Sequence, residues 1–303
     1  MNFFLELLVG GLTKGGIYAL IALGYTMVYG IIALINFAHG EIYMIGAFTG
    51  LIASLFFSSL GLTGWALLAL VIMVAALWAA MYGLTLEKIA YAPLRKASRL
   101  SPLISAIGAS IFLQNFVLLT QTPNYLLFPD LASDLPGLSF LKPIAHLASP
   151  IQVCVIVMVA LILAVLTFIL KKTWTGLAMR AVSQDPLMAQ LTGINLNKVI
   201  ARTFILGSVL AAIGGVLIGC ATRQIDSNIG FLAGLKAFTA AVLGGVGSAP
   251  GAVLGALILG FAESFTAGYF SGDFEDVVAF VLLTLILTIK PSGLLGQKIA
   301  QKV

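Results

Sequence analysis

Long apolar runs separated by short polar or basic segments dominate this chain. The runs cover Leu7–Leu34, Ile42–Leu60, Trp65–Leu86, Pro102–Thr120, Ile151–Leu170, Thr203–Ala221, Phe231–Ala267 and Val277–Ile289. A helix needs about 20 mostly apolar residues to cross the hydrocarbon core of a bilayer. The pattern therefore predicts an all-α integral membrane protein with about eight transmembrane helices, in a range of seven to nine. We expect a single transmembrane domain over residues 1–303.

Two interruptions within this pattern suggest broken membrane segments. Asn36–Glu41 (NFAHGE) is either a tight turn between two spans or a break at membrane depth. The run Phe231–Ala267 is split by Gly244–Gly251 (GGVGSAPG), and it forms either two short spans or a re-entrant hairpin. Irregular backbone at membrane depth survives only where protein or a water-filled path surrounds it. We therefore expect a glycine-rich broken or re-entrant segment in each half, close to a transport pathway.

The basic residues are unevenly distributed over the polar segments. Glu87–Arg99 and Lys171–Arg202 are rich in Lys and Arg, whereas 121–149 and Ser271–Asp276 are poor in them. The positive-inside rule makes the first pair cytoplasmic and the second pair periplasmic. The C-terminus is then cytoplasmic. The N-terminus lies outside if Asn36–Glu41 is a cytoplasmic turn, and its side stays open if that segment lies deep in the membrane.

Composition supports the membrane assignment and excludes several kinds of site. Hydrophobic residues make up 60% of the chain and charged residues 9%, against about 25% charged residues in soluble domains. The net charge of +5 is carried by loops beside spans, so no nucleic-acid partner is expected. Cys154 and Cys220 lack metal-ligand spacing, and no phosphate-binding G-x-x-x-x-G-K-[ST] motif occurs. We expect neither a bound metal nor enzymatic activity.

The basic segment 171–202 has a helical pattern of its own. Gly176–Val182 suits one short helix, and Asp185 with Pro186 suits the start of a second. Gly193 suits the position just past its end. Helices of about two turns are not stable alone in water, so they need a surface on which to pack. That surface belongs either to the same chain or to a partner, and an ordinary basic connector remains the alternative.

Three separated segments carry a resemblance to a known family. They read W-T-G-L-A-M-R-A-V-S-Q-D-P-L-M-A-Q-L-T-G-I-N in the basic segment, I-N-F-A-H-G-E-I-Y-M-I-G-A at Ile35–Ala47, and G-L-K-A-F-T-A-A-V-L-G-G-V-G-S-A-P-G-A-V-L-G-A-L-I-L-G at Gly234–Gly260. In this order they resemble the permease subunits of bacterial branched-chain amino acid ABC importers, of the LivH type. The resemblance extends over nearly the whole chain.

The resemblance implies translocation of leucine, isoleucine or valine across the bacterial inner membrane. It implies a related second permease subunit, two ATP-binding subunits that use ATP and Mg, and a periplasmic binding protein for branched-chain amino acids. The chain itself would bind no cofactor and would contact the lipid bilayer. Two other classes stay open: a self-sufficient channel or secondary carrier for small amphipathic solutes, and a membrane enzyme, for which no catalytic constellation is present.

The resemblance also implies where the functional residues lie. Coupling to the ATP-binding subunits falls on Gly176, Arg180, Ala181, Gln184, Asp185, Pro186, Met188 and Gly193. In that arrangement Arg180 and Gln184 face the partner, while Leu177, Ala181, Met188 and Leu191 pack inward. The expected pathway residues are Asn36, His39, Glu41, Lys236, Thr239, Gly244, Gly245, Gly247 and Gly251.

Four ionisable residues lie in apolar surroundings and are candidates for a functional role. His39 and Glu41 are two positions apart, so on a helix they do not face one another as a metal or acid–base pair. Glu263 is either a functional intramembrane acid or a residue near the outer interface. Lys236 either meets a substrate carboxylate at the outer mouth or extends toward the interface.

Overall fold

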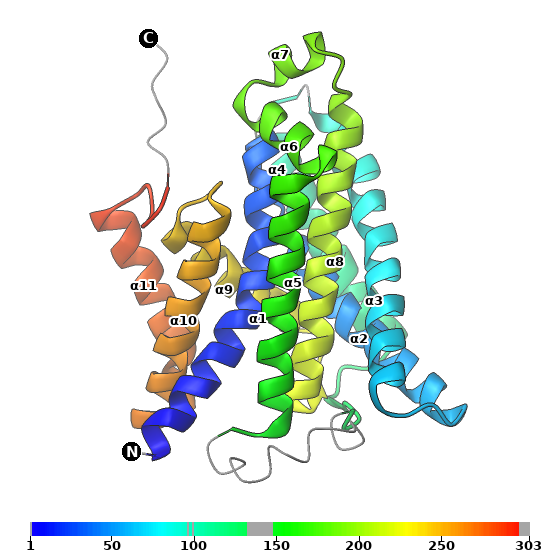
Figure 1. Cartoon of the computed structure of the whole chain (residues 1–303), viewed down its shortest axis with the longest axis vertical. Coiled ribbons are helices and arrows are strands. Elements are labelled where there is room, and N and C mark those ends of the chain that lie inside the picture. The colour runs from blue at the N-terminus through cyan, green and yellow to red at the C-terminus, as the bar shows by residue number, and fades with distance from the viewer. Residues whose placement is uncertain (1, 96, 99, 132–147, 297–303) are drawn as a thin grey trace.

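The computed structural model describes residues 2–95, 97–98, 100–131 and 148–296, and it consists almost entirely of helices (Figure 1). Its α-helices are α1 (Asn2–Ile32), α2 (His39–Ser59), α3 (Gly64–Leu86), α4 (Leu100–Thr120), α5 (Pro150–Lys172), α6 (Trp174–Gln184), α7 (Pro186–Leu191), α8 (Leu196–Thr222), α9 (Ile229–Gly244), α10 (Ala249–Tyr269) and α11 (Glu275–Ile289). The shorter helical turns are η1 (Glu87–Tyr91), η2 (Ala92–Leu94) and η4 (Gly272–Phe274). Two short strands, β1 (Leu126–Leu127) and β2 (Gln224–Ile225), pair antiparallel.

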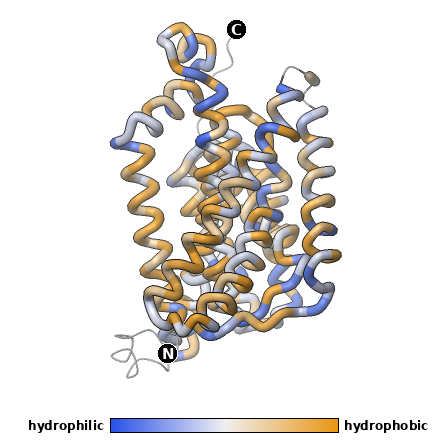
Figure 2. Tube along the Cα trace, turned by 90° about the vertical axis from the view of Figure 1, so that its right-hand side faces the viewer, coloured by the Kyte–Doolittle hydropathy of each residue, from blue (hydrophilic) through white to orange (hydrophobic). Residues whose placement is uncertain are grey.

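Within the described residues, seven helices are long and apolar enough to cross a membrane. They are α1, α2, α3 with its continuation to Leu94, α4, α5, α8 and α10, and α9 is a shorter apolar helix. Figure 2 shows hydrophobic residues along most of the length of the outer helices. The prediction of an all-α integral membrane protein is confirmed. Of the predicted periplasmic loop 121–149, residues 132–147 lie outside the described residues.

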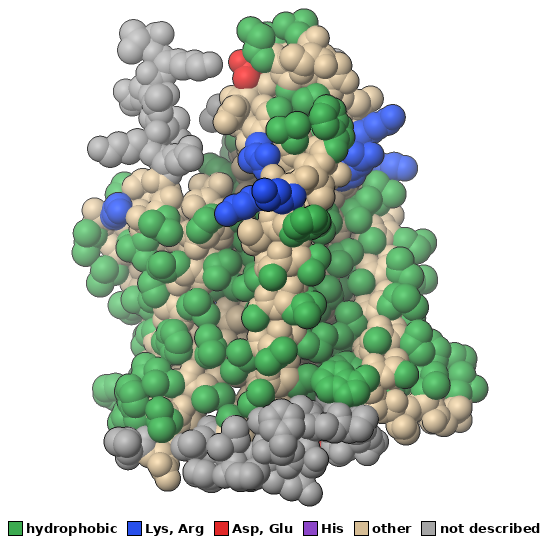
Figure 3. Space-filling view, in the orientation of Figure 1, with side chains coloured by type: hydrophobic (Ala, Val, Ile, Leu, Met, Phe, Trp, Pro, Cys, Tyr) green, Lys and Arg blue, Asp and Glu red, His purple; other side chains and the backbone are tan. Residues whose placement is uncertain are grey.

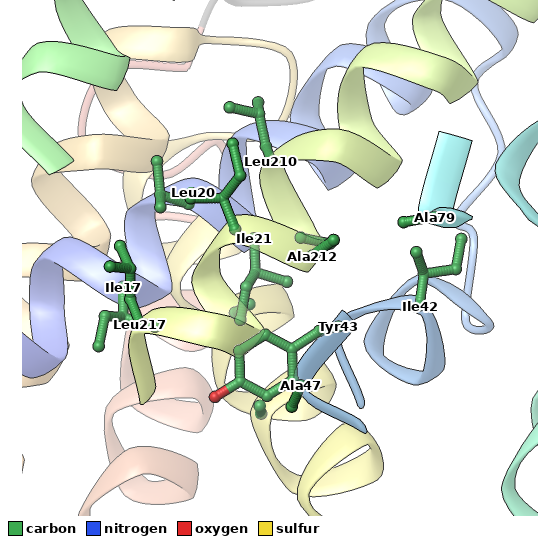
Figure 4. Packing of buried hydrophobic residues seen from close by; sticks show 14 of the residues in the cluster. Ile17, Leu20, Ile21, Ile42, Tyr43, Ala47, Ala79, Leu210, Ala212 and Leu217 are labelled. Atoms are coloured by element: carbon green, nitrogen blue, oxygen red, sulfur yellow. The ribbon is translucent and has the colours of Figure 1, made fainter. Parts of the chain in front are cut away.

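Small residues set the packing at the centre of the bundle, where α2 and α8 run side by side. A methyl group at Gly46 would overlap Ala212, and one at Gly215 would overlap the backbone of Tyr43. In lipid, helices associate through close packing more than through the hydrophobic effect, and small residues permit it. Side chains of α1 fill the remaining space, as Ile17 and Ile21 show (Figure 4).

The first interruption is a break in helical structure whose second half is mostly buried in the bundle. After α1 the chain is non-helical through residues 33–38, starting with Ala33 at a φ of 51°. It returns into the bundle before α2 begins, because His39 lies against Gly24 of α1 and Gly207 of α8, both far from the helix ends. Asn36, His39 and Glu41 are each 1% exposed. The segment thus connects two helices that are each long enough to span a membrane, and its end from Asn36 onward is mostly buried inside the bundle.

The second interruption is the turn of a helical hairpin formed by α9 and α10. A methyl group at Gly255 would meet the Ala240 carbonyl, and one at Gly251 would meet Gly244, so the two helices are antiparallel and in close contact. The turn requires glycine, since Gly245 has a φ of 109° and Gly247 a φ of 92°. The run predicted as two short spans or a hairpin is therefore a hairpin of one short helix, α9, and one helix of membrane-spanning length, α10, joined by residues 245–248.

The segment after α11 closes this turn. Leu294 N donates to the Leu243 carbonyl at 2.9 Å, and Leu295 N donates to the Gly244 carbonyl at 2.8 Å. These bonds satisfy carbonyls at the end of α9 that the helix itself cannot satisfy. The end of α11 and the hairpin turn thus lie together, at the upper left in Figure 1.

Candidate functional site

The predicted coupling segment forms two short helices, α6 and α7, at one end of the bundle (Figure 1). The Asp185 Oδ1 atom accepts hydrogen bonds from Leu187 N at 2.9 Å and Met188 N at 3.0 Å. Pro186 occupies the first turn of α7. Gly193 follows the helix with a φ of 89°. The predicted N-cap at Asp185, the proline in the first turn and the glycine just past the end of α7 are all confirmed.

The prediction of which face packs inward is wrong. Leu177, Met188 and Leu191 are 46%, 57% and 73% exposed, and only Ala181 of the predicted stripe is partly buried. The buried contacts are made instead by Ala178, Met179, Val182, Ala189 and Val199 of α8. Gly176 shows the physical reason: any side chain there would collide with the Leu170 carbonyl at the end of α5. A face of mostly small residues permits this approach, and the larger leucines remain outside.

This packing leaves an apolar surface on α7, which we call the α7 patch: Leu187, Met188 and Leu191. Leu187 is 65% exposed, and the three residues share one face of the helix. Figure 3 shows hydrophobic side chains at the top of the molecule over α7. Exposed apolar clusters on a water-facing loop mark protein contacts.

The polar coupling candidates divide into two groups. Gln184 is exposed at the end of α6. Arg180 is also exposed, but its Nη1 donates to the Leu170 carbonyl, so its guanidinium lies over the end of α5. The coupling roles of both residues stay predictions.

The polar residues of the first break gather in the bundle interior. Tyr91 Oη donates to Asn36 Oδ1 at 2.9 Å, and Ser110 Oγ donates to Glu41 Oε1 at 3.0 Å. Within the described part of the chain, Asn36 Nδ2, His39 Nε2 and Glu41 Oε2 have no hydrogen-bond partner. Buried polar atoms without a partner point to water, a ligand or a change of conformation.

The starts of α2 and α9 meet at this place. Gly40 packs directly on Gly230 and Gly234, and the Glu41 carboxylate lies beside Gly230. Helix N-termini carry partial positive charge, so Glu41 lies where two such ends converge. The first break is therefore in contact with the start of the helical hairpin, which sequence order alone does not reveal.

Lys236 has a different environment from either of its predicted ones. Its Nζ lies 3.2 Å from Glu263 Oε1 and 2.7 Å from Asp276 Oδ1, and its side chain is 13% exposed. Tyr18 Oη donates to Glu263 Oε2 at 2.8 Å. A lysine paired with two carboxylates is not a free cation for a substrate carboxylate. It forms an ion network that ties α1, α9, α10 and α11 together.

The remaining pathway candidates belong mainly to the hairpin. Thr239 is fully buried, and its hydroxyl donates to the Leu235 carbonyl at 2.9 Å. Gly244 and Gly251 hold α9 against α10. Gly247 lines a cavity of about 590 Å³ that also reaches α1, α5 and α6. Residues of the hairpin turn and of α6 thus line the same cavity.

Among the described residues no group of His, Cys, Asp and Glu is arranged to hold a metal ion. Cys154 and Cys220 are both buried as free thiols.

Comparison with known proteins agrees with this architecture. Residues 7–287 match the family model of the branched-chain amino acid transport system permease component. The high-affinity branched-chain amino acid transport system permease protein BraD of Pseudomonas aeruginosa is 48% identical over 99% of this chain and 98% of its own length. LivH of Escherichia coli K12, named likewise, is 45% identical over the same shares. A probable LivH of Methanocaldococcus jannaschii is 26% identical over 96% of this chain and 92% of its own length. No solved structure matches. The chain belongs to the family of permease components of branched-chain amino acid transport systems.

Proposed function

We propose that this chain is the membrane-spanning permease subunit of an ATP-driven importer that carries leucine, isoleucine and valine across the bacterial inner membrane. The observation that carries the proposal is the sequence identity of 48% and 45%, over nearly the full length, to two permease proteins of high-affinity branched-chain amino acid transport systems. Two separate ATP-binding subunits bind ATP with Mg and hydrolyse it to drive transport. A related second permease subunit completes the pathway, and a periplasmic binding protein delivers the amino acid.

The α7 patch supports an ATP-binding partner on the loop side. Basic residues gather around this end of the molecule (Figure 3), which the positive-inside rule assigns to the cytoplasm. The six-residue helix α7 exposes Leu187, Met188 and Leu191, and no described part of the chain covers them. A soluble subunit that covers the patch would gain binding energy from it and stabilise the short helix.

The structure offers a continuous route from this loop to the buried break. α6 and α7 pack on α8 through Val182, Ala189 and Val199. Further along, α8 contacts α2 at Gly46 and the His39 ring at Gly207. Movement of the loop would therefore move α8 relative to the start of α2. We infer that this movement opens and closes the pathway at the contact between α2 and α9.

The carrier alternative has less support from the buried acids. Glu263 is paired with Lys236, and Glu41 accepts a hydrogen bond from Ser110. Neither acid belongs to a chain of acids and histidines of the kind that relays protons through secondary carriers. The exposed α7 patch also favours a subunit that works with a soluble partner.

Uptake in cells tests the proposal. A strain that lacks the gene should take up labelled leucine more slowly at low external concentration, and the wild-type chain should restore uptake. Labelled proline, which lies outside the proposed substrate class, serves as the control and should be unaffected. Unchanged leucine, isoleucine and valine uptake in the deletion strain would contradict the proposed substrate class.

A further inference from the structure

The cavity between α1, α5, α6 and the hairpin turn combines an apolar interior with a basic rim. Its volume is about 590 Å³, and its apolar walls include Met27, Leu163, Leu166 and Val253. Lys171 at the end of α5 and Arg180 of α6 line the same cavity. We call it the α1–α5 groove.

The rim carries positive charge with no acid in the lining. Lys171 and Arg180 are exposed, and no Asp or Glu is among the described residues that line the groove. Arg180 uses Nη1 to bind the Leu170 carbonyl, which leaves further N–H donors of its guanidinium for another acceptor. Figure 3 shows Lys and Arg side chains gathered where α5 ends, directly above its hydrophobic surface.

The apolar walls and the basic rim together indicate which kind of ligand the groove can bind. An amino acid would bring an ammonium group, and none of the described lining residues has a carboxylate to pair with it. An amphiphile with an anionic head and a long apolar tail satisfies both the rim and the walls. The inner leaflet supplies such molecules on the side to which the basic loops belong, and basic pockets between membrane helices bind their headgroups.

We propose that the α1–α5 groove binds one anionic phospholipid of the cytoplasmic leaflet. Its phosphate lies between Lys171 and Arg180, and an acyl chain lies along α1 and α5. Met179 and Ser183 of α6 line the groove opposite Gly247 and Pro250 of the hairpin. The bound lipid thus contacts the coupling helix and the hairpin together, so the anionic lipid content of the membrane influences coupling.

Native mass spectrometry of the purified full chain tests the headgroup contact. The probes are phosphatidylglycerol and phosphatidylethanolamine with identical acyl chains. The wild-type chain should retain one phosphatidylglycerol in preference to phosphatidylethanolamine. Replacing both rim charges (K171Q with R180Q) should weaken retention about 30-fold, on the basis of the usual contribution of two basic residues. The matched variant K88Q with K198Q removes two exposed basic residues outside the groove and should retain the lipid.

A charge-neutral pair of variants tests the acyl chain contact. Leu163→Trp fills the groove and should displace phosphatidylglycerol, whereas Leu161→Trp, on the same helix outside the lining, should not. The proposal is overturned if phosphatidylglycerol shows no preference, or if K88Q with K198Q loses it equally. Displacement of the lipid by leucine would make the groove a substrate site, displacement by inorganic phosphate a free anion site, and displacement by a second permease subunit an interface.

Discussion

Replacing Leu191 with alanine separates docking from folding. Leu191 ends α7, is 73% exposed and belongs to the α7 patch. Substitutions at exposed positions without special contacts change stability by less than about 0.5 kcal/mol. We therefore expect Leu191→Ala to insert and fold normally. Any loss of partner binding then reports on the surface itself.

The expected loss of docking free energy follows from the exposed fraction of the Leu191 side chain. Burying a whole leucine side chain contributes about 1.5–3 kcal/mol. Since 73% of Leu191 is available for burial, truncation to alanine should remove about 1–2 kcal/mol from docking. That corresponds to an increase of about 5- to 30-fold in the Kd for the ATP-binding subunit.

The assay is the affinity of the purified ATP-binding subunit for the purified chain in detergent. Leu161→Ala is the matched control, because Leu161 is 63% exposed on the membrane helix α5. The control should bind the subunit as the wild type does. A Kd for Leu191→Ala within twofold of the wild-type value would show that the α7 patch is not the docking surface.

Three further perturbations test the topology, the hairpin and the ion network. Single cysteines are placed at the exposed positions Asn124 and Ser98 in a background without the native cysteines. In intact cells an impermeant thiol reagent should react with the cysteine at position 124 and not with the one at position 98. The reverse labelling pattern would invert the topology. Gly251→Leu should abolish transport because any side chain there meets Gly244, and normal transport at normal expression would show that the close contact is dispensable. Lys236→Met should destabilise the protein by about 3–5 kcal/mol, because it leaves the buried carboxylate of Glu263 without its cation. The double variant with Glu263→Gln should recover part of the lost melting temperature. A Lys236→Met protein that melts at the wild-type temperature would contradict the ion network.

The sequence was sufficient wherever the signal was local. Apolar runs of membrane length predicted the spans, and Asp185, Pro186 and Gly193 predicted the start and end of α7 because caps act within a few residues. The glycine turn at Gly244–Gly251 was predictable for the same reason, since positive φ angles favour glycine.

The packing face of the coupling loop was not predictable from hydrophobicity alone. Both faces of α6 are apolar, with Leu177 on one and Met179 on the other. The choice depends on side-chain size at the contact with α5, where Gly176 permits close approach and a leucine does not. Without the position of α5, the larger stripe looked like the buried one.

Contacts between distant segments were also beyond the sequence. Lys236 and Glu263 lie on different helices of the hairpin, and their pairing depends on the antiparallel register of α9 and α10. The depth of His39 depends on how the chain after α1 returns to Gly24 and Gly207. Neither feature leaves a pattern in neighbouring residues.

Uptake by proteoliposomes tests the central claim most directly. The full chain is purified from its native membranes with whatever subunits accompany it, reconstituted, and supplied with labelled leucine and the periplasmic binding protein. The account predicts that ATP-binding subunits co-purify and that leucine accumulates only when ATP is present on the side of the α7 patch. Leucine uptake that is equally fast without ATP, from a preparation without ATP-binding subunits, would contradict it.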